Sequence, residues 1–138
     1  MTGKYKFNKK QVIILAAGGT GGHVFPGLAV ANKLSKSNFD VVWLGTRKGL
    51  ESKIAKDNNF KIYYINIVGL RGKNILNWFQ FPMLLIISII KSIILIYKLK
   101  PCCVLGMGGF VSAAGGIGSI LTRTPLIIQE QNAVEGTT

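Results

Sequence analysis

The chain has few of the residues that build disulfide frameworks and metal clusters. Its 138 residues include two cysteines and one histidine. The cysteines, Cys102 and Cys103, are adjacent, and adjacent side chains of a strand point to opposite faces, so they cannot form an ordinary disulfide. We therefore expect neither a disulfide framework nor a bound metal, and this cysteine usage fits a protein of a reducing compartment.

Acidic residues are also scarce, because 5 Asp and Glu oppose 17 Lys and Arg, which gives a formal net charge of +12. This excess indicates an anionic partner: nucleic acid, acidic lipid or a phosphorylated substrate. The lysines are scattered, with no basic stripe interleaved with aromatic residues, so nucleic acid is not an expected partner. Apolar residues make up 49% of the chain, which excludes a disordered protein and suffices for the core of one domain.

Glycine, by contrast, is concentrated in one stretch, Gly18-Gly19-Thr20-Gly21-Gly22-His23. This stretch follows an apolar run over 12–17 and precedes a helical pattern over 24–35. Glycines let backbone N–H groups approach a ligand closely, and the first N–H groups of a helix carry partial positive charge. The stretch therefore predicts a phosphate or pyrophosphate site, with a ligand-free tight turn as the alternative.

The common phosphate motifs do not fit this stretch. The dinucleotide spacing would need a third glycine where Val24 stands, and the P-loop would need Ser or Thr where Asn74 follows Gly72-Lys73. A dinucleotide site also places an acid after the second strand, and no acid follows directly after the run over 41–46. A nucleotide-binding oxidoreductase is therefore disfavoured.

Apolar runs that alternate with helical patterns predict an α/β fold with a doubly wound, Rossmann-like parallel sheet. We expect strands over 12–17, 41–44, 61–65, 102–105 and 126–128, and helices over 24–35, 49–57, 83–99 and 111–121. Pro82 is expected in the first turn of the third helix, and 106–110 as a second glycine loop. In the usual strand order, 3-2-1-4-5, the first and fourth strands are neighbours, so both glycine loops would flank one crevice. Glycines at 115, 116 and 118 would permit close helix packing.

The most apolar region, residues 75–99, indicates contact with a membrane. The fifteen residues 83–97 would cover only about 22 Å of a hydrocarbon core about 30 Å thick, and Lys91 interrupts them. We therefore expect reversible, interfacial attachment rather than a spanning helix, with a buried core helix as the alternative for its C-terminal half. Aromatic and basic residues form the expected anchor on anionic lipid. They are Trp78, Phe79, Phe81, Arg71 and Lys73, with Lys100 nearby.

Four stretches of the chain, taken together and in this order, resemble the MurG family of glycosyltransferases. They are residues 18–27, 69–73 (Gly-Leu-Arg-Gly-Lys), 106–109 (Gly-Met-Gly-Gly) and 130–132 (Glu-Gln-Asn). The resemblance implies the N-terminal half of a two-domain GT-B hexosyltransferase of peptidoglycan synthesis. Such an enzyme moves N-acetylglucosamine from UDP-N-acetylglucosamine to undecaprenyl-diphosphate-linked MurNAc-pentapeptide, with inversion and without a metal or cofactor. It also implies a peripheral position on the cytoplasmic face of the bacterial inner membrane.

The resemblance also implies roles for individual residues. His23 is the candidate catalytic base, although the residues alone leave a ligand-orienting role equally open, and Glu130 is a weaker alternative base. Contacts to UDP-N-acetylglucosamine are implied for Thr20, Gly21, Gly22 and Asn132. Contacts to the acceptor diphosphate are implied for Gly18, Gly19, Gly106, Gly108 and Gly109. Phe110 and Gln129 depart from the usual Tyr and His of the family, so hydrogen bonds from those side chains are not carried over.

Members of this family are more than twice as long as the present chain. We therefore expect residues 1–138 to be an incomplete acceptor-binding domain, with the donor-binding domain outside this sequence. The 138 residues alone are expected to be inactive as a transferase. A function of another class, a non-catalytic, membrane-attached module that binds a phosphorylated ligand, is the alternative.

Overall fold

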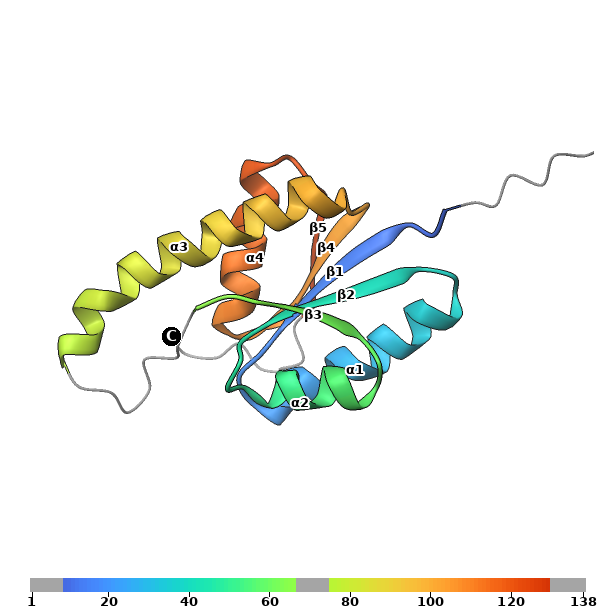
Figure 1. Ribbon diagram of the computed structural model, residues 1–138, viewed down its shortest axis with the longest axis horizontal. Helices are drawn as coiled ribbons and strands as arrows, with labels where there is room; N and C mark the ends of the chain where they lie inside the picture. Colours follow the sequence, from blue (N-terminus) through green and yellow to red (C-terminus); the bar gives the residue numbers. More distant parts are fainter. Residues whose placement is uncertain (1–8, 67–74, 130–138) are drawn as a thin grey trace, which may run out of the picture.

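The computed structural model describes residues 9–66 and 75–129, which form a five-stranded parallel sheet covered by four helices (Figure 1). The strand order, β3-β2-β1-β4-β5, is the predicted one, and the α/β doubly wound class is confirmed. The elements, in chain order, are β1 (Val12–Ala17), α1 (Gly21–Lys36), β2 (Asp40–Gly45), α2 (Leu50–Asp57), β3 (Lys61–Tyr64), α3 (Ile75–Leu99), β4 (Cys103–Gly108), α4 (Gly109–Leu121) and β5 (Leu126–Ile128).

The sheet separates two apolar cores, because successive side chains of a strand point to opposite faces. Leu15 and Ala17 of β1 pack with residues of α1 and α2, whereas Ile14 and Ala16 pack with residues of α3 and α4. Figure 1 shows the same division, with α3 and α4 on one side of the sheet and α1 and α2 on the other. The central strands are therefore buried on both faces, as their near-continuous apolar sequence predicts.

Small residues let α4 pack closely, as predicted. A Cβ on Gly115 would lie 3.1 Å from Cδ2 of Leu44 and 3.2 Å from Cβ of Ala16. A Cβ on Gly118 would lie 3.0 Å from Cβ of Ser92, on the neighbouring helix α3. Glycine at these positions therefore sets how near α4 comes to the sheet and to α3.

Two boundaries near the glycine stretches differ from the prediction. Helix α1 begins at Gly21 rather than Val24, so Gly21, Gly22 and His23 form its first turn. Strand β4 continues to Gly108 and α4 begins at the next residue, so the predicted second glycine loop over 106–110 is wrong. The physical reason is that Gly108 and Gly109 adopt positive φ angles of 115° and 82°, which turn the strand directly into the helix.

Helix α3 is longer than predicted. It begins at Ile75, so Pro82 lies inside the helix rather than in its first turn, and Phe79–Leu99 is long and apolar enough to cross a membrane by length and composition. The expectation that this segment is too short is therefore wrong. A proline inside a helix lacks one N–H donor, and here the helical pattern continues through it.

The two sides of α3 have different surroundings. On one side Ser88, Ser92, Leu95 and Ile96 are buried, and the Ser92 hydroxyl donates to the Ser88 carbonyl at 2.9 Å. The opposite side exposes apolar side chains spaced three and four residues apart, which we call the α3 stripe. It consists of Phe79, Met83, Ile86, Ile90, Ile94 and Tyr97. Helix α3 is thus a core helix on one side and an uncovered apolar surface on the other.

Both cysteines are free thiols; Cys102 precedes β4 and Cys103 is its first residue. Burial, and then the neighbouring Cys102, raises the pKa of Cys103 to about 11. We expect Cys103 to react slowly with iodoacetamide at pH 8 and faster as the pH rises, in a Cys102→Ser variant followed by mass spectrometry, because burial, the largest cause of the raised pKa, persists in that variant. The same shift makes its contribution to stability full below about pH 9 and lost as the pH rises to about 11. Equal rates for the folded chain and the urea-unfolded chain at pH 8 would contradict this prediction.

Candidate functional site

The two glycine stretches follow neighbouring strands at the carboxyl edge of the sheet, where open α/β sheets bind their ligands. Ala16 pairs with Gly106 and Ala17 with Gly108, so the register shifts and Met107 is the extra residue of a β-bulge. Bulges redirect the backbone and are frequent beside functional sites. Here the bulge brings the end of β4 against the first glycine stretch.

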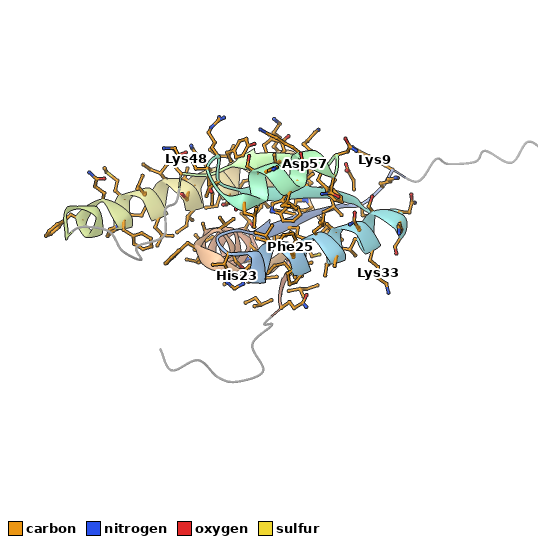
Figure 2. The ribbon with its side chains drawn as sticks, turned by 90° about the horizontal axis from the view of Figure 1, so that it is seen from below. Lys9, His23, Phe25, Lys33, Lys48 and Asp57 are labelled. Atoms are coloured by element: carbon orange, nitrogen blue, oxygen red, sulfur yellow. The ribbon has the colours of Figure 1, made fainter. Side chains whose placement is uncertain are left out.

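The first glycine stretch and the β4–α4 junction are in direct contact. A Cβ on Gly109 would collide with the carbonyl oxygen of Gly18, and a Cβ on Gly108 would occupy the position of the His23 imidazole. His23 therefore lies over Gly108, where the starts of α1 and α4 meet, and Figure 2 shows it at the start of α1. The prediction that the two stretches lie together is confirmed.

The first turn of α1 presents backbone donors. Thr20 is the N-cap residue, and its carbonyl accepts hydrogen bonds from His23 N at 3.0 Å and Val24 N at 3.2 Å. Its side chain makes no capping hydrogen bond, and the first N–H groups of a helix have no intrahelical acceptor. Gly19, with a φ of 95°, has open space where a Cβ would stand. The N–H groups of Gly21 and Gly22 are thus suited to an anionic or hydroxyl-bearing ligand.

A buried carboxylate that the sequence analysis missed lies behind this stretch. Glu51 is fully buried, and its Oε1 accepts hydrogen bonds from the backbone N–H and the hydroxyl of Thr46, both at 2.8 Å. A Cβ on Gly18 would lie 3.0 Å from Oε1, and Cβ atoms on Gly45 or Gly49 would also collide with Glu51. Three glycines from separate segments therefore make the space for this one carboxylate.

Glu51 lies beyond the end of the second strand, so the prediction that no acid follows that strand directly still holds. It stands six residues after Gly45, in the first turn of α2, and folds back to the residue that follows β2. Because the carboxylate is fully buried, it is placed to hold the loop after β2 rather than to hold a ribose. The available signal was an acid in a first helical turn, where the helix dipole favours negative charge.

Phe110 and Gln129, the two departures from the family pattern, have identifiable contacts. The Phe110 ring meets the Phe81 ring edge-on, with centroids 5.4 Å apart, and so connects the site to α3. The backbone N–H of Gln129 donates to the Gly106 carbonyl at 2.9 Å, while its side chain is exposed. Phe81 is only half-buried and packs on the second core, so less of its ring is available to lipid than of Phe79, which is 80% exposed.

Other predicted site residues lie outside the described residues. These are Asn132, Glu130, Arg71 and Lys73, and the side chain of Trp78. Among residues 9–66 and 75–129, no group of three or more His, Cys, Asp or Glu side chains is placed to hold a metal ion.

The fold and the glycine-lined site define a class: a Rossmann-like α/β domain with a ligand site at the carboxyl ends of its central strands. The model of the glycosyltransferase family 28 N-terminal domain matches residues 13–138, and the chain belongs to this family. It is 45% identical over 132 residues to a Vesicomyosocius okutanii protein named UDP-N-acetylglucosamine–N-acetylmuramyl-(pentapeptide) pyrophosphoryl-undecaprenol N-acetylglucosamine transferase. A Nitrosococcus oceani protein of the same name is 46% identical over 125 residues.

These matches cover most of this chain but a minority of each relative. The match with the first relative covers 96% of this chain and 39% of the relative. The match with the second covers 91% of this chain and 35% of the relative. The crystal structure of Acinetobacter baumannii MurG superposes with a TM-score of 0.79 at 40% identity, over 94% of this chain and 37% of that one. A UDP-GlcNAc 2-epimerase from Methanocaldococcus jannaschii, at 19% identity and a TM-score of 0.60 over 88% of this chain and 31% of that one, shares the fold alone.

Proposed function

We propose that these residues are the acceptor-binding half of an enzyme that transfers N-acetylglucosamine from UDP-N-acetylglucosamine to undecaprenyl-diphosphate-linked MurNAc-pentapeptide. The names of the relatives and the family membership support this proposal. The observation that carries it is the position of the His23 imidazole over Gly108, where both glycine stretches meet. A proton-accepting side chain beside a phosphate-binding backbone is what transfer to a diphosphate-linked sugar requires.

In the proposed mechanism the acceptor diphosphate binds at Gly18, Gly19, Gly106, Gly108 and Gly109. Among these glycines Gly19 has open space on its Cβ side, whereas protein atoms already occupy that side of the other four. His23 accepts the proton of the muramyl hydroxyl as its oxygen attacks the anomeric carbon of the donor sugar. The bond from that carbon to the UDP oxygen breaks, so UDP leaves and the configuration inverts. Thr20, Gly21, Gly22 and Asn132 are proposed to contact UDP-N-acetylglucosamine.

This function can be tested with a joined chain, in which these residues are followed by the part of a relative that they do not match. We expect a joined chain, made of these 138 residues followed by the remainder of the Vesicomyosocius relative, to transfer labelled N-acetylglucosamine to the lipid-linked acceptor. The 138-residue polypeptide alone should show no turnover, because it supplies only part of the contacts that would hold the donor in attack geometry. An inactive joined chain that nevertheless folds and binds UDP would count against the proposed function, as would turnover by the 138 residues alone.

We also propose that the domain attaches peripherally to the cytoplasmic face of the bacterial inner membrane through the α3 stripe and Trp78. The buried side of α3 packs on α4 and the sheet, so a spanning position would expose that side to lipid and break these contacts. An interfacial position covers only the exposed side. The net charge of +12 adds attraction to anionic lipid.

Vesicle co-sedimentation checks this attachment. Binding to vesicles with anionic lipid should weaken in high salt and fall severalfold in a Phe79→Ser, Ile86→Ser double variant, because both side chains are exposed apolar surface. The matched change Phe25→Ser, at an exposed position of α1 on the other side of the sheet, should leave binding unchanged. Resistance to extraction by alkaline carbonate would instead mean that α3 spans the bilayer.

A further inference from the structure

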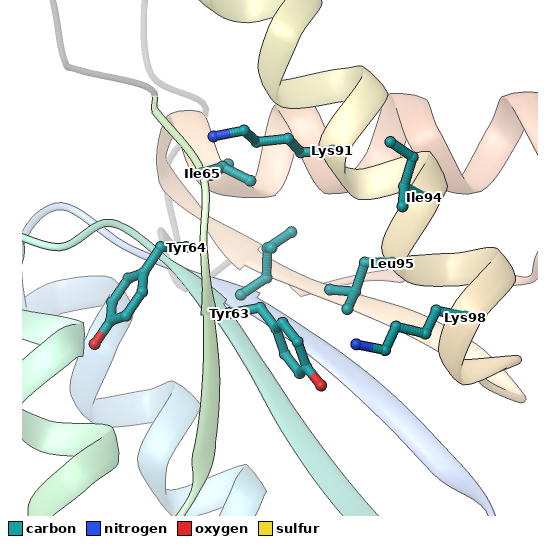
Figure 3. Close-up of a pocket in the computed structure, with 8 residues that line it drawn as sticks. Tyr63, Tyr64, Ile65, Lys91, Ile94, Leu95 and Lys98 are labelled. Atoms are coloured by element: carbon teal, nitrogen blue, oxygen red, sulfur yellow. The ribbon is translucent and has the colours of Figure 1, made fainter.

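A cavity separate from the glycine-lined site lies between the carboxyl end of β3 and α3 (Figure 3). Its volume is about 220 Å³, and none of its lining residues belongs to the glycine stretches. They are Leu44, Tyr63, Tyr64, Ile65, Lys91, Ile94, Leu95 and Lys98. Drug-sized ligands occupy about 300–1,000 Å³, so this cavity has room for only part of a larger molecule.

The inner surface of the cavity is apolar. Leu44, Ile65 and Leu95 are almost completely buried. The Tyr64 hydroxyl, 2.9 Å from the Ser52 hydroxyl, is turned towards α2 and away from the cavity. The interior therefore suits a hydrocarbon segment rather than a sugar or a base.

The rim of the cavity is cationic. Lys91 and Lys98 extend from α3 towards β3, and the Lys98 ammonium lies 5.6 Å from the Tyr63 ring centroid. Lys91 makes no ion pair or hydrogen bond with another residue of 9–66 or 75–129. Among these residues the acids are Asp40, Glu51 and Asp57, and none lines the cavity. Lys91 is exposed at the rim, so its ammonium is accessible to the anionic group of a bound molecule.

The cavity is continuous with the α3 stripe, because Ile94 lines the one and belongs to the other. A hydrocarbon chain that begins in the cavity can thus continue along an exposed apolar surface. Its attached anion would lie at the rim, beside Lys91. The apolar interior, the cationic rim and the adjoining α3 stripe together suit an amphiphilic anion.

We infer that this cavity binds one anionic phospholipid molecule, with part of an acyl chain between β3 and α3 and the phosphate held by Lys91. This inference rests on the peripheral membrane attachment proposed above and names a specific lipid site within it. The lipid would fix the orientation of the domain on the bilayer, which the α3 stripe alone does not specify. Lys98 remains over the Tyr63 ring.

Titration of the 138-residue chain with short-chain lipids below their micelle concentration tests the inference. We expect dihexanoyl-phosphatidylglycerol to shift the NMR methyl signals of Ile65, Ile94 and Leu95, and Lys91→Gln to weaken binding about tenfold by removing one charge-assisted contact. Lys33→Gln, the same change on α1 across the sheet, should leave the affinity unchanged. Dihexanoyl-phosphatidylcholine, whose headgroup has no net charge, should bind more weakly.

Several results would overturn the inference. They are an unchanged affinity in Lys91→Gln, shifts confined to methyl groups outside the cavity, or tighter binding of farnesyl diphosphate than of phosphatidylglycerol, which would assign the cavity to a prenyl-diphosphate acceptor. Inorganic phosphate alone should not move these methyl signals. Ile90→Ser separates this proposal from general attachment, because Ile90 belongs to the α3 stripe but does not line the cavity. It should weaken vesicle binding while leaving binding of the monomeric lipid intact.

Discussion

Replacement of His23 by alanine in the joined chain is expected to lower kcat by roughly 10²–10⁴-fold, the usual contribution of a general base. The His23 imidazole lies over Gly108 at the junction of the two glycine stretches, where the acceptor hydroxyl is proposed to bind. A base acts on the acceptor hydroxyl only as the transition state forms, so KM should change much less than kcat. Steady-state kinetics with labelled UDP-N-acetylglucosamine and the lipid-linked acceptor measure both constants.

The alternative role for His23 has a different kinetic signature. If the imidazole only orients the acceptor, kcat should persist and the KM for acceptor should rise. Asn32→Ala is the matched control, since Asn32 is an exposed residue farther along the same helix and should leave both constants unchanged. Recovery of kcat on addition of imidazole to His23→Ala would favour the base.

Much of the fold follows from periodic features of the sequence. Five apolar runs, of which the first four are each followed by a helical pattern, predict a parallel sheet, because parallel strands need crossover connections. The strand order then places the residues after β1 and β4 side by side. The association of Gly18 with Gly109 could therefore be predicted, although no local signal connects residues so far apart in the chain.

The parts that could not be predicted depend on three-dimensional packing. Whether Gly108 ends a strand or belongs to a loop is decided by its positive φ and by the register shift at Met107, which the sequence does not encode locally. Glu51 looks like an ordinary exposed acid of a short helix. Its burial requires that Gly18, Gly45 and Gly49 all converge on it, and that convergence exists only in the folded sheet.

The start of α3 differs from the prediction for a related reason. Proline is most common in the first turn of a helix, so the sequence predicts Pro82 there. The structure instead continues the helix back to Ile75, and Phe81 on the preceding turn packs against Phe110 of α4. A tertiary contact thus accompanies a helix turn that the local proline preference would not select.

Replacement of Gly109 by alanine is expected to be the most damaging single-methyl change at the site. Its φ of 82° strains any residue with a Cβ, at roughly 1–2 kcal/mol. The added Cβ would also collide with the backbone carbonyl of Gly18, and overpacking of this kind costs roughly 1–3 kcal/mol. Because a backbone atom cannot rotate away as a side chain can, both costs should apply, for a loss of roughly 2–5 kcal/mol of unfolding free energy.

Gly19 provides the matched control for this prediction. Its φ of 95° is also positive, but no atom lies within 4 Å of the position where a Cβ would stand. Gly19→Ala should therefore lower the unfolding free energy only by the cost of placing a Cβ at a positive φ, roughly 1–2 kcal/mol. Urea unfolding of the 138-residue chain measures both variants against the wild type. Equal losses would mean that the Gly18 carbonyl moves aside freely, and the two glycine stretches would then not hold each other in place around His23.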